Sequence, residues 1–198
     1  SVDTSERIFG TFVAHLKFIA DTLGAKGRHV VQTREPGGTE LAGQFRARLL
    51  TEKLEPMAGT QLIFKARADH IARVIEPALA AGSYVVCDRF TDATYAYQGA
   101  GEGVPREVID RLTKDTCRGL VPDRTLVFDV PYTVSTQRLQ TSGKELDRFE
   151  RQDQAFVERV RSEYSRIART DPKRVRLIDA SADIAQIRER IVENLEGL

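Results

Sequence analysis

Two charged pairs stand beside short runs of strand-forming residues, where phosphate chemistry could occur. Asp88 and Arg89 directly follow the apolar run 84–87, and Arg34 and Glu35 stand directly before a Pro-Gly-Gly sequence. A carboxylate at a strand end can hold Mg²⁺, and an arginine guanidinium makes forked, charge-assisted hydrogen bonds to phosphate. The alternatives are a capping aspartate with a structural ion pair at 88–89 and an ordinary surface turn at 34–38. The first interpretation predicts a site for a phosphorylated ligand and Mg²⁺.

Helical and strand patterns alternate along the chain and would place both pairs at one edge of a sheet. Strands are expected at 29–31, 84–87, 125–129 and 175–179, and helices at about 16–23, 41–50, 60–81, 106–118, 156–167 and 184–195. A third acid, Asp129, closes one of these strands. The alternation predicts an α/β fold of three αβα layers, in which helices surround a parallel β-sheet. In that architecture ligands bind beyond the carboxyl ends of the strands.

The charge balance argues against nucleic acid or a membrane as the partner. The 198 residues carry 30 Lys and Arg against 29 Asp and Glu, a formal net charge of +1. The positive residues are 23 Arg and 7 Lys. This excess of forked donors is a weak indication of phosphorylated ligands, and a GC-rich genome would produce the same bias. A local site is therefore expected to carry the function.

Composition and length predict one cytoplasmic domain spanning residues 1–198. A hydrophobic fraction of 41% with 30% charged residues is typical of a folded globular protein. Cys87 and Cys117 are the only cysteines, so no disulfide framework is indicated. Neither has a second Cys or a His at metal-ligand spacing, and no run approaches the ~18 apolar residues of a transmembrane helix.

Six segments extend the two charged pairs into an ordered set. They read TREPGGT at 33–39, FKARADH at 64–70, VCDRFTDATYAYQG at 86–99, PDRTL at 122–126, ELDRFE at 145–150 and IDAS at 178–181. Together and in this order they closely resemble the bacterial thymidylate kinase family, P-loop enzymes that phosphorylate dTMP with ATP. The resemblance runs from about residue 15 to the C-terminus and implies the P-loop kinase fold.

The resemblance implies a nearly complete acceptor site. Arg34 and Arg89 would grip the dTMP phosphate, Phe64 would stack on the thymine ring, and Arg67 would reach the carbonyl edge of the base. The other substrate-binding residues that it implies are Glu35, Thr94, Tyr97 and Gln98. Tyr97 would lie where a ribose 2′-hydroxyl would clash. On helix spacing alone, Phe64 is better explained as a core residue.

The resemblance also implies the catalytic groups and the partners. Asp88 would bind Mg²⁺ or orient the acceptor phosphate, beside Arg89. Arg148 would come from a lid at about 138–152 and supply positive charge to the transferred group, with Arg138 as a second contributor. Without the family context, Arg148 is a solvated charge at a helix start. ATP and dTMP are the implied substrates, and the helices at 60–81 and 106–118 could form the face of a homodimer.

One expected element is missing from the sequence. A kinase of this fold should carry G-x-x-x-x-G-K-[ST], which wraps the donor phosphates, and no such motif occurs in the chain. The family spacing places its lysine at Phe12 and its hydroxyl residue at Val13, after Gly10 and Thr11. Smaller departures are Lys65, Asp69 and Glu102; the last stands where the family usually has Arg and puts negative charge near the phosphate region.

Three explanations of the missing motif remain open. The apolar run Ile8–Val13 could be the central first strand with the phosphate loop shortened away, leaving little ATP affinity. The first residues could instead differ from the natural segment of an ordinary kinase, or an unconventional loop could bind the nucleotide. Two functions follow: a thymidylate kinase that makes dTDP from dTMP and ATP, or a catalytically silent relative that binds thymidine nucleotides.

Overall fold

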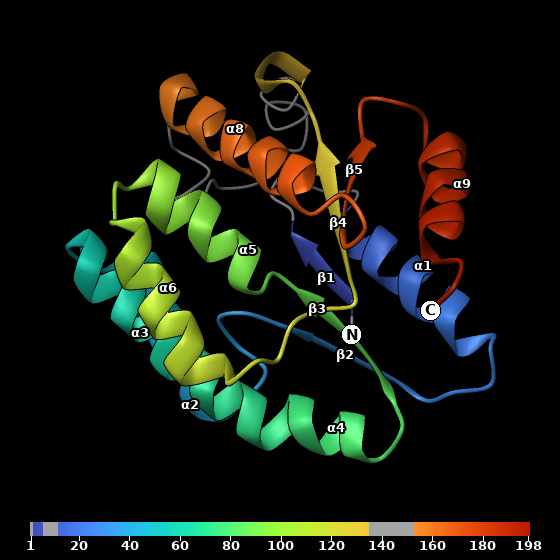
Figure 1. Cartoon of the computed structure of the whole chain (residues 1–198), viewed down its shortest axis with the longest axis horizontal. Helices are drawn as coiled ribbons and strands as arrows, with labels where there is room; N and C mark the ends of the chain where they lie inside the picture. Colours follow the sequence, from blue (N-terminus) through green and yellow to red (C-terminus); the bar gives the residue numbers. More distant parts are fainter. Residues whose placement is uncertain (1, 6–11, 135–152) are drawn as a thin grey trace.

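A five-stranded parallel sheet forms the centre of the computed structural model, which describes residues 2–5, 12–134 and 153–198 (Figure 1). Its strands are β1 (Val2–Ser5), β2 (Val30–Arg34), β3 (Tyr84–Asp88), β4 (Arg124–Asp129) and β5 (Val175–Asp179). They are ordered β2-β3-β1-β4-β5, and every neighbouring pair is parallel. Parallel neighbours need crossover connections, and helices of the chain provide them.

Two helices cover one face of the sheet, as Figure 1 shows. They are α1 (Phe12–Gly24) and α9 (Ile184–Leu195). The strand residues Val86, Leu126 and Ile178 are buried in one cluster with Ile19 of α1 and Ile191 of α9. Successive residues of a strand point to opposite faces, so the neighbours of these residues must pack on the other side.

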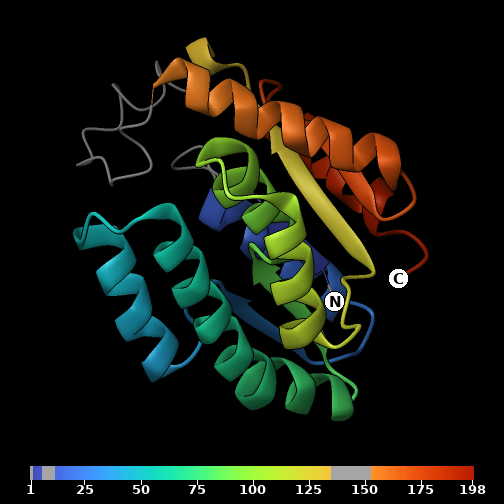
Figure 2. The ribbon, with the colours of Figure 1, turned by 60° about the vertical axis from the view of Figure 1, so that its left-hand side comes forward.

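The remaining helices lie on the opposite side of the sheet (Figure 2). They are α2 (Glu40–Thr51), α3 (Pro56–His70), the π-helical η1 (Ile71–Ile75), α4 (Glu76–Ala80), α5 (Thr91–Thr94), the π-helical η2 (Tyr95–Gly101), α6 (Arg106–Cys117) and α8 (Gln154–Thr170). On this side α2 packs on α3. Val85 packs with Ile71 and Ile75, and Val127 packs against α8. The three-layer αβα fold predicted from the sequence is thereby confirmed.

The first strand differs from the sequence interpretation. The central strand is Val2–Ser5, and not the predicted run Ile8–Val13: Phe12 and Val13 begin α1, and residues 8–11 lie outside the described residues. Three of the four β1 residues are polar, which hides the strand from hydrophobicity patterns, whereas its pairing with both β3 and β4 stabilises it. The described helix therefore starts where the family spacing places the P-loop lysine.

The other predicted helices and strands are present in the structure, but some of them begin or end at different residues. The long helix expected at 60–81 begins at Pro56, because proline is favoured in the first turn, and its second half widens into η1. The strand expected at 29–31 continues to Arg34. Arg34 therefore ends a strand, and the turn begins at Glu35.

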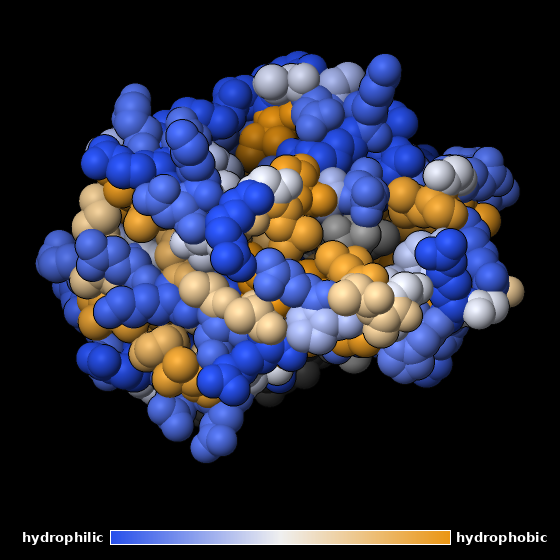
Figure 3. Space-filling view, turned by 60° about the horizontal axis from the view of Figure 1, so that its bottom comes forward, coloured by the Kyte–Doolittle hydropathy of each residue, from blue (hydrophilic) through white to orange (hydrophobic). Residues whose placement is uncertain are grey.

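The surface is mixed in character. Figure 3 shows hydrophobic side chains across the middle of one face with hydrophilic side chains around them. The large hydrophobic residues that are most exposed come from separate elements: Leu41, Val121, Leu177 and Ile184. Among the described residues, no helix is both long and apolar enough to cross a membrane.

Candidate active site at the carboxyl edge of the sheet

The two charged pairs noted in the sequence meet at the ends of β2 and β3. Arg34 is the register partner of Asp88 in this parallel pair, so the last residues of both strands lie side by side. The Glu35 backbone N–H donates to the Asp88 carbonyl at 2.9 Å and continues the pairing for one residue beyond β2. Nε of Arg89 lies 3.7 Å from Oδ1 of Asp88. The two charged pairs, Arg34 with Glu35 and Asp88 with Arg89, are therefore neighbours at this edge.

The backbone at Arg89 is unusual. Its φ is +67°, in the left-handed region that residues other than glycine seldom occupy. This turn takes the chain from β3 into α5 and leaves the Arg89 side chain half-buried at the edge. Non-glycine residues in such conformations cluster at functional sites, where surrounding structure holds them in place.

A pocket of about 490 Å³, its open mouth included, lies between this edge and the helices α2, α3, α5 and η2. The predicted site residues that line it are Glu35, Arg67, Arg89, Thr94, Tyr97 and Gln98. Leu49, Ile63 and Phe90 add apolar wall. The structure thus brings six of the predicted site residues to one pocket.

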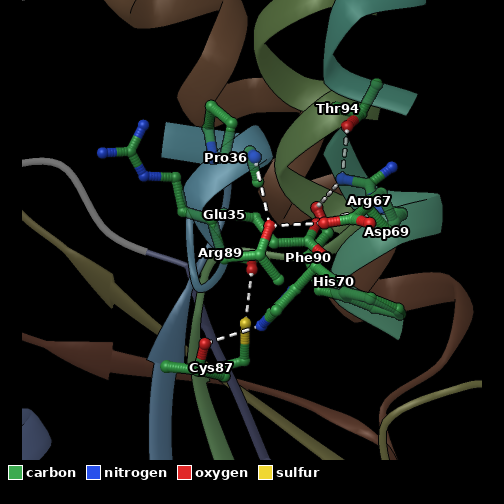
Figure 4. A network of polar contacts seen from close by, with 12 residues as sticks. Glu35, Pro36, Arg67, Asp69, His70, Cys87, Arg89, Phe90 and Thr94 are labelled. Atoms are coloured by element: carbon green, nitrogen blue, oxygen red, sulfur yellow. Dashed lines mark hydrogen bonds and ion pairs between the residues drawn. The ribbon is translucent and has the colours of Figure 1, made fainter. Parts of the chain in front are cut away.

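The wall of the pocket is organised by a buried ion pair (Figure 4). Arg67 and Glu35 are each 2% exposed, and Arg67 Nε donates to Glu35 Oε2 at 2.6 Å. Arg67 Nη2 donates to the Phe90 carbonyl at 3.2 Å and to the Thr94 hydroxyl at 3.0 Å. Burial has the largest single effect and would lower the pKa of Arg67, but the charge and hydrogen bond of Glu35, together with Cys117 and Cys87, raise that pKa overall. The guanidinium is therefore charged and held from three sides.

The third nitrogen of this guanidinium lacks a protein partner. Nη1 of Arg67 is buried and has no hydrogen-bond partner within residues 2–5, 12–134 and 153–198. A buried donor without a partner costs about 1–3 kcal/mol, and Arg67 is one of the residues that line the pocket, so an acceptor on a ligand there would remove this cost. A carbonyl oxygen or a carboxylate could satisfy it.

Sequence reasoning missed two members of this network. His70 Nδ1 lies 2.9 Å from Glu35 Oε1, and His70 Nε2 lies 2.6 Å from Thr33 Oγ1. Phe64, Arg67 and His70 recur every third residue of α3, which places them on one helix face. That spacing was the available signal, but it does not identify Glu35 and Thr33 as the partners.

Phe64 lies beneath Arg67 and is 3% exposed. Its ring packs on Val104 and Ile109, and the Arg67 guanidinium carbon stands 4.8 Å from the ring centroid. Phe64 is not among the residues that line the pocket. Its contacts therefore support Arg67 from below, and no ring face of Phe64 forms pocket wall.

The far wall is built by η2 and supported by α8. The Tyr97 ring stands 6.3 Å from Phe156 and 6.4 Å, edge to face, from Tyr164. Gly101 lets α8 approach closely, because a Cβ there would lie 2.6 Å from the Phe156 ring. Glu102 accepts a hydrogen bond of 3.4 Å from the Gln98 amide, so its negative charge faces a donor.

Two further predictions concern the Mg²⁺ site and the lid. Within the part of the chain that the structure describes, no three His, Cys, Asp or Glu residues cluster as a metal centre. Mg²⁺ is commonly held by one or two carboxylates together with ligand phosphates, a pattern that Asp88 between Arg34 and Arg89 fits. The whole predicted lid at 138–152, with Arg138 and Arg148, lies outside the described residues, as do Gly10 and Thr11.

Fold and site together define a phosphotransferase of the P-loop kinase class, with a parallel sheet between helical layers and a basic pocket at its carboxyl edge. The family model described as thymidylate kinase matches residues 14–191. A thymidylate kinase of Cupriavidus metallidurans is 46% identical over 184 residues, covering 93% of this chain and 91% of that protein. The chain belongs to the thymidylate kinase family.

Two more relatives support this assignment. A thymidylate kinase of Pseudomonas syringae pv. tomato is 48% identical over 184 residues, which is 91% of this chain and 87% of the relative. The crystal structure of thymidylate kinase from Ehrlichia chaffeensis superposes with a TM-score of 0.77 at 29% identity. The superposition covers 98% of this chain and 97% of the Ehrlichia chaffeensis chain.

Proposed function

We propose that this thymidylate kinase transfers the γ-phosphoryl group of ATP to dTMP and that the pocket at the β2 and β3 ends binds dTMP. The observation that carries the proposal is the buried Arg67 Nη1 donor in the pocket wall, together with the Asp88 and Arg89 pair at the sheet edge. Arg67 Nη1 is suited to a carbonyl oxygen of a base, and the sheet edge with Arg89 is suited to a phosphate.

The phosphate of dTMP would lie at the strand ends. Arg34 and Arg89 provide two guanidinium groups there, which can meet a phosphate with paired, charge-assisted hydrogen bonds. Nε of Arg89 is buried and, within the described residues, forms no hydrogen bond. Its 3.7 Å distance from Asp88 is too long for one, which leaves the fork available to an anion.

The nucleoside would extend from the edge into the pocket. Arg67 Nη1 would donate to a carbonyl of thymine, while Thr94, Tyr97 and Gln98 from α5 and η2 would contact base and sugar. Stacking of the thymine on Phe64 requires its ring to become exposed. In the structure that ring supports Arg67, so Phe64 acts on the base through the orientation of the guanidinium.

Transfer of the phosphoryl group depends mainly on positioning and on neutralising charge at the transferring group. Asp88 would hold Mg²⁺, which when bound neutralises phosphate charge. Arg89 would hold the acceptor phosphate so that its oxygen faces the donor. Arg148 would add positive charge to the transferred group, a role that rests on the resemblance of ELDRFE at 145–150.

The donor side departs from the family pattern. The segment between β1 and α1 is the place of a P-loop in this fold, and α1 begins with Phe12 and Val13 instead of a lysine and a hydroxyl residue. These residues do not fit a lysine grip on the donor phosphates. No step of the transfer is assigned to residues 6–13.

A coupled assay of ADP formation tests the proposal. We expect turnover that depends on dTMP and fails with dAMP or dGMP as acceptor. Asp88→Ala and Arg148→Ala should reduce kcat at least about a hundredfold, since each removes charge stabilisation from the transfer. His29→Asn, at an exposed histidine near Ser83, is the control and should retain activity. ADP formation of equal rate with all three acceptors would contradict the proposal.

A homodimer through the outer surfaces of α3 and α6 is also proposed. Support comes from Met57, which is 37% exposed at the start of α3 although the helix packs inward against α6. Light scattering should give twice the 22.2 kDa mass of one chain, and Met57→Asp should shift the mass toward one chain. A single-chain mass for the unmodified protein would contradict it.

A cytoplasmic location is proposed on the state of the thiols. Cys87 and Cys117 are both buried and both free. Free cysteines are typical of a reducing compartment. Fractionation of the cells that produce the protein should recover it with the cytoplasmic enzymes, and recovery from an oxidising compartment would contradict the location.

A further inference from the structure

A chain of four side chains runs behind the pocket from β2 to α3. It links Thr33, His70, Glu35 and Arg67 through distances of 2.6, 2.9 and 2.6 Å (Figure 4). His70 is completely buried, and Glu35 and Arg67 are each 2% exposed. Of these four, Glu35 and Arg67 line the pocket, whereas His70 reaches it only through Glu35.

The partners determine the tautomer of His70. The Glu35 carboxylate already accepts a hydrogen bond from Arg67, and an ionised carboxylate can only accept, so Nδ1 of His70 must carry a proton and donate to Oε1. Nε2 then accepts from the Thr33 hydroxyl. A neutral ring also matches the charges, because one cation and one anion already balance and a second buried cation would be costly.

The turn after Glu35 fixes the position of the ring. Gly38 has a φ of +85° and lies directly against His70. A Cβ at this position would stand 2.5 Å from His70 Nε2 and 2.6 Å from Thr33 Oγ1. The backbone of the Pro-Gly-Gly turn therefore closes the space in which the imidazole could rotate.

We propose that His70 is a positioning residue for base recognition: it fixes the Glu35 carboxylate, which in turn aims Arg67 Nη1 at the carbonyl of the pyrimidine. The inference rests on the proposed function. Without the Nδ1 hydrogen bond, Glu35 can rotate and Arg67 loses the partner that sets the plane of its fork. Nη1 then no longer points at one defined atom.

The consequence is discrimination between pyrimidines. Thymine presents a carbonyl oxygen where cytosine presents an amino group. A fixed Nη1 donor favours the first and opposes the second, because the amino group would leave that donor unpaired. A donor free to turn away discriminates less. His70 should therefore influence the ratio of dTMP to dCMP affinity more than it influences the fold.

Calorimetric titration of the full chain with dTMP and with dCMP tests this inference. His70→Leu keeps the apolar volume but removes both ring nitrogens, and we expect the affinity ratio to fall about tenfold, equivalent to about 1.4 kcal/mol. In His70→Asn the side-chain amide can donate in place of Nδ1, so the ratio should recover to within about threefold of the unmodified chain. His29→Leu, at an exposed histidine, should leave the ratio unchanged.

A second measurement examines the ring of His70 in the unmodified chain. Ring ¹⁵N NMR of the histidine-labelled chain, assigned with His70→Asn, should show a neutral His70 protonated at Nδ1. A ring protonated at Nε2, or an unchanged affinity ratio in His70→Leu, would overturn the inference while leaving the kinase proposal intact. If the unmodified chain binds dTMP and dCMP equally, the base recognition proposed for Arg67 is itself wrong, and the inference falls with it.

Discussion

Asp92 and Arg174 form a bidentate ion pair that joins two distant parts of the chain. Nη1 and Nη2 of Arg174 lie 2.6 and 3.1 Å from the two carboxylate oxygens of Asp92, which is 4% exposed. The Thr125 hydroxyl donates to the same carboxylate at 3.0 Å. Asp92 lies in α5, two residues before Thr94 of the pocket. The pair therefore fixes the helix that follows β3.

Breaking this pair should destabilise the fold. Arg174→Met leaves the Asp92 carboxylate buried and without its cation, which should cost about 3 kcal/mol of unfolding free energy. Urea unfolding followed by circular dichroism measures the change. In the double variant Asp92→Asn with Arg174→Met the loss should be smaller, because no buried charge remains. A loss in Arg174→Met below about 0.5 kcal/mol, as is usual for a surface ion pair, would contradict the structural role.

Gly38→Ala should weaken dTMP binding. The added Cβ cannot fit against His70 and Thr33, so the ring must move, and overpacking of this kind costs about 1–3 kcal/mol. We expect a dTMP dissociation constant raised at least about fivefold in calorimetry. Gly82→Ala is the matched control, since Gly82 has a similar φ of +76° but nothing within 4 Å of the added atom. Equal effects of both variants on dTMP affinity would show that backbone conformation, and not the His70 contact, is responsible.

The thiol of Cys117 should be inert at moderate pH. Burial raises its pKa to about 11, although the nearby Arg67 charge acts in the opposite direction. Only the thiolate reacts, so at pH 8 roughly one thiol in a thousand is reactive. In a Cys87→Ala background, alkylation by iodoacetamide should be slow at pH 8 and accelerate up to about pH 11. The chain unfolded in urea should react at the rate of an ordinary cysteine, and an equal rate in the folded chain would contradict the assigned burial.

Restoring the P-loop motif should increase turnover. The four replacements Glu6→Gly, Thr11→Gly, Phe12→Lys and Val13→Thr produce G-x-x-x-x-G-K-[ST] at 6–13. The lysine and hydroxyl serve the donor phosphates and Mg²⁺, so kcat with dTMP should rise at least about tenfold. The dissociation constant for dTMP should stay within about twofold, since the acceptor pocket is separate. Unchanged kcat in the fourfold variant would show that the present segment already serves ATP.

Much of the architecture could be predicted from the sequence because its signals are local. Hydrophobic patterns in the sequence correspond to elements of the structure in three places. These are the apolar run 84–87, the strand that ends at Asp129 and the helix that contains Phe156 and Val160. The first strand could not be predicted in this way. The polar residues of Val2–Ser5 form a strand through pairing with β3 and β4, which no local pattern records.

The site was predictable in its parts but not in its connections. Motif resemblance identified Glu35, Arg67 and Thr94, and all three line the pocket. His70 and Thr33 contact each other although they are 37 residues apart in the sequence. Asp92 and Arg174 form an ion pair although they are 82 residues apart. Such partners are set by how α3 meets β2 and how the residue before β5 meets α5, so single-sequence reasoning has no signal for them.

Calorimetric titration of the full chain with dTMP and with dGMP tests the central claim most directly, because it examines the acceptor pocket apart from the unusual N-terminal segment. The account predicts saturable binding of one dTMP per chain, lost in Arg67→Met, and no binding of dGMP at the same concentrations. Absence of dTMP binding, or equal binding of both nucleotides, would contradict it.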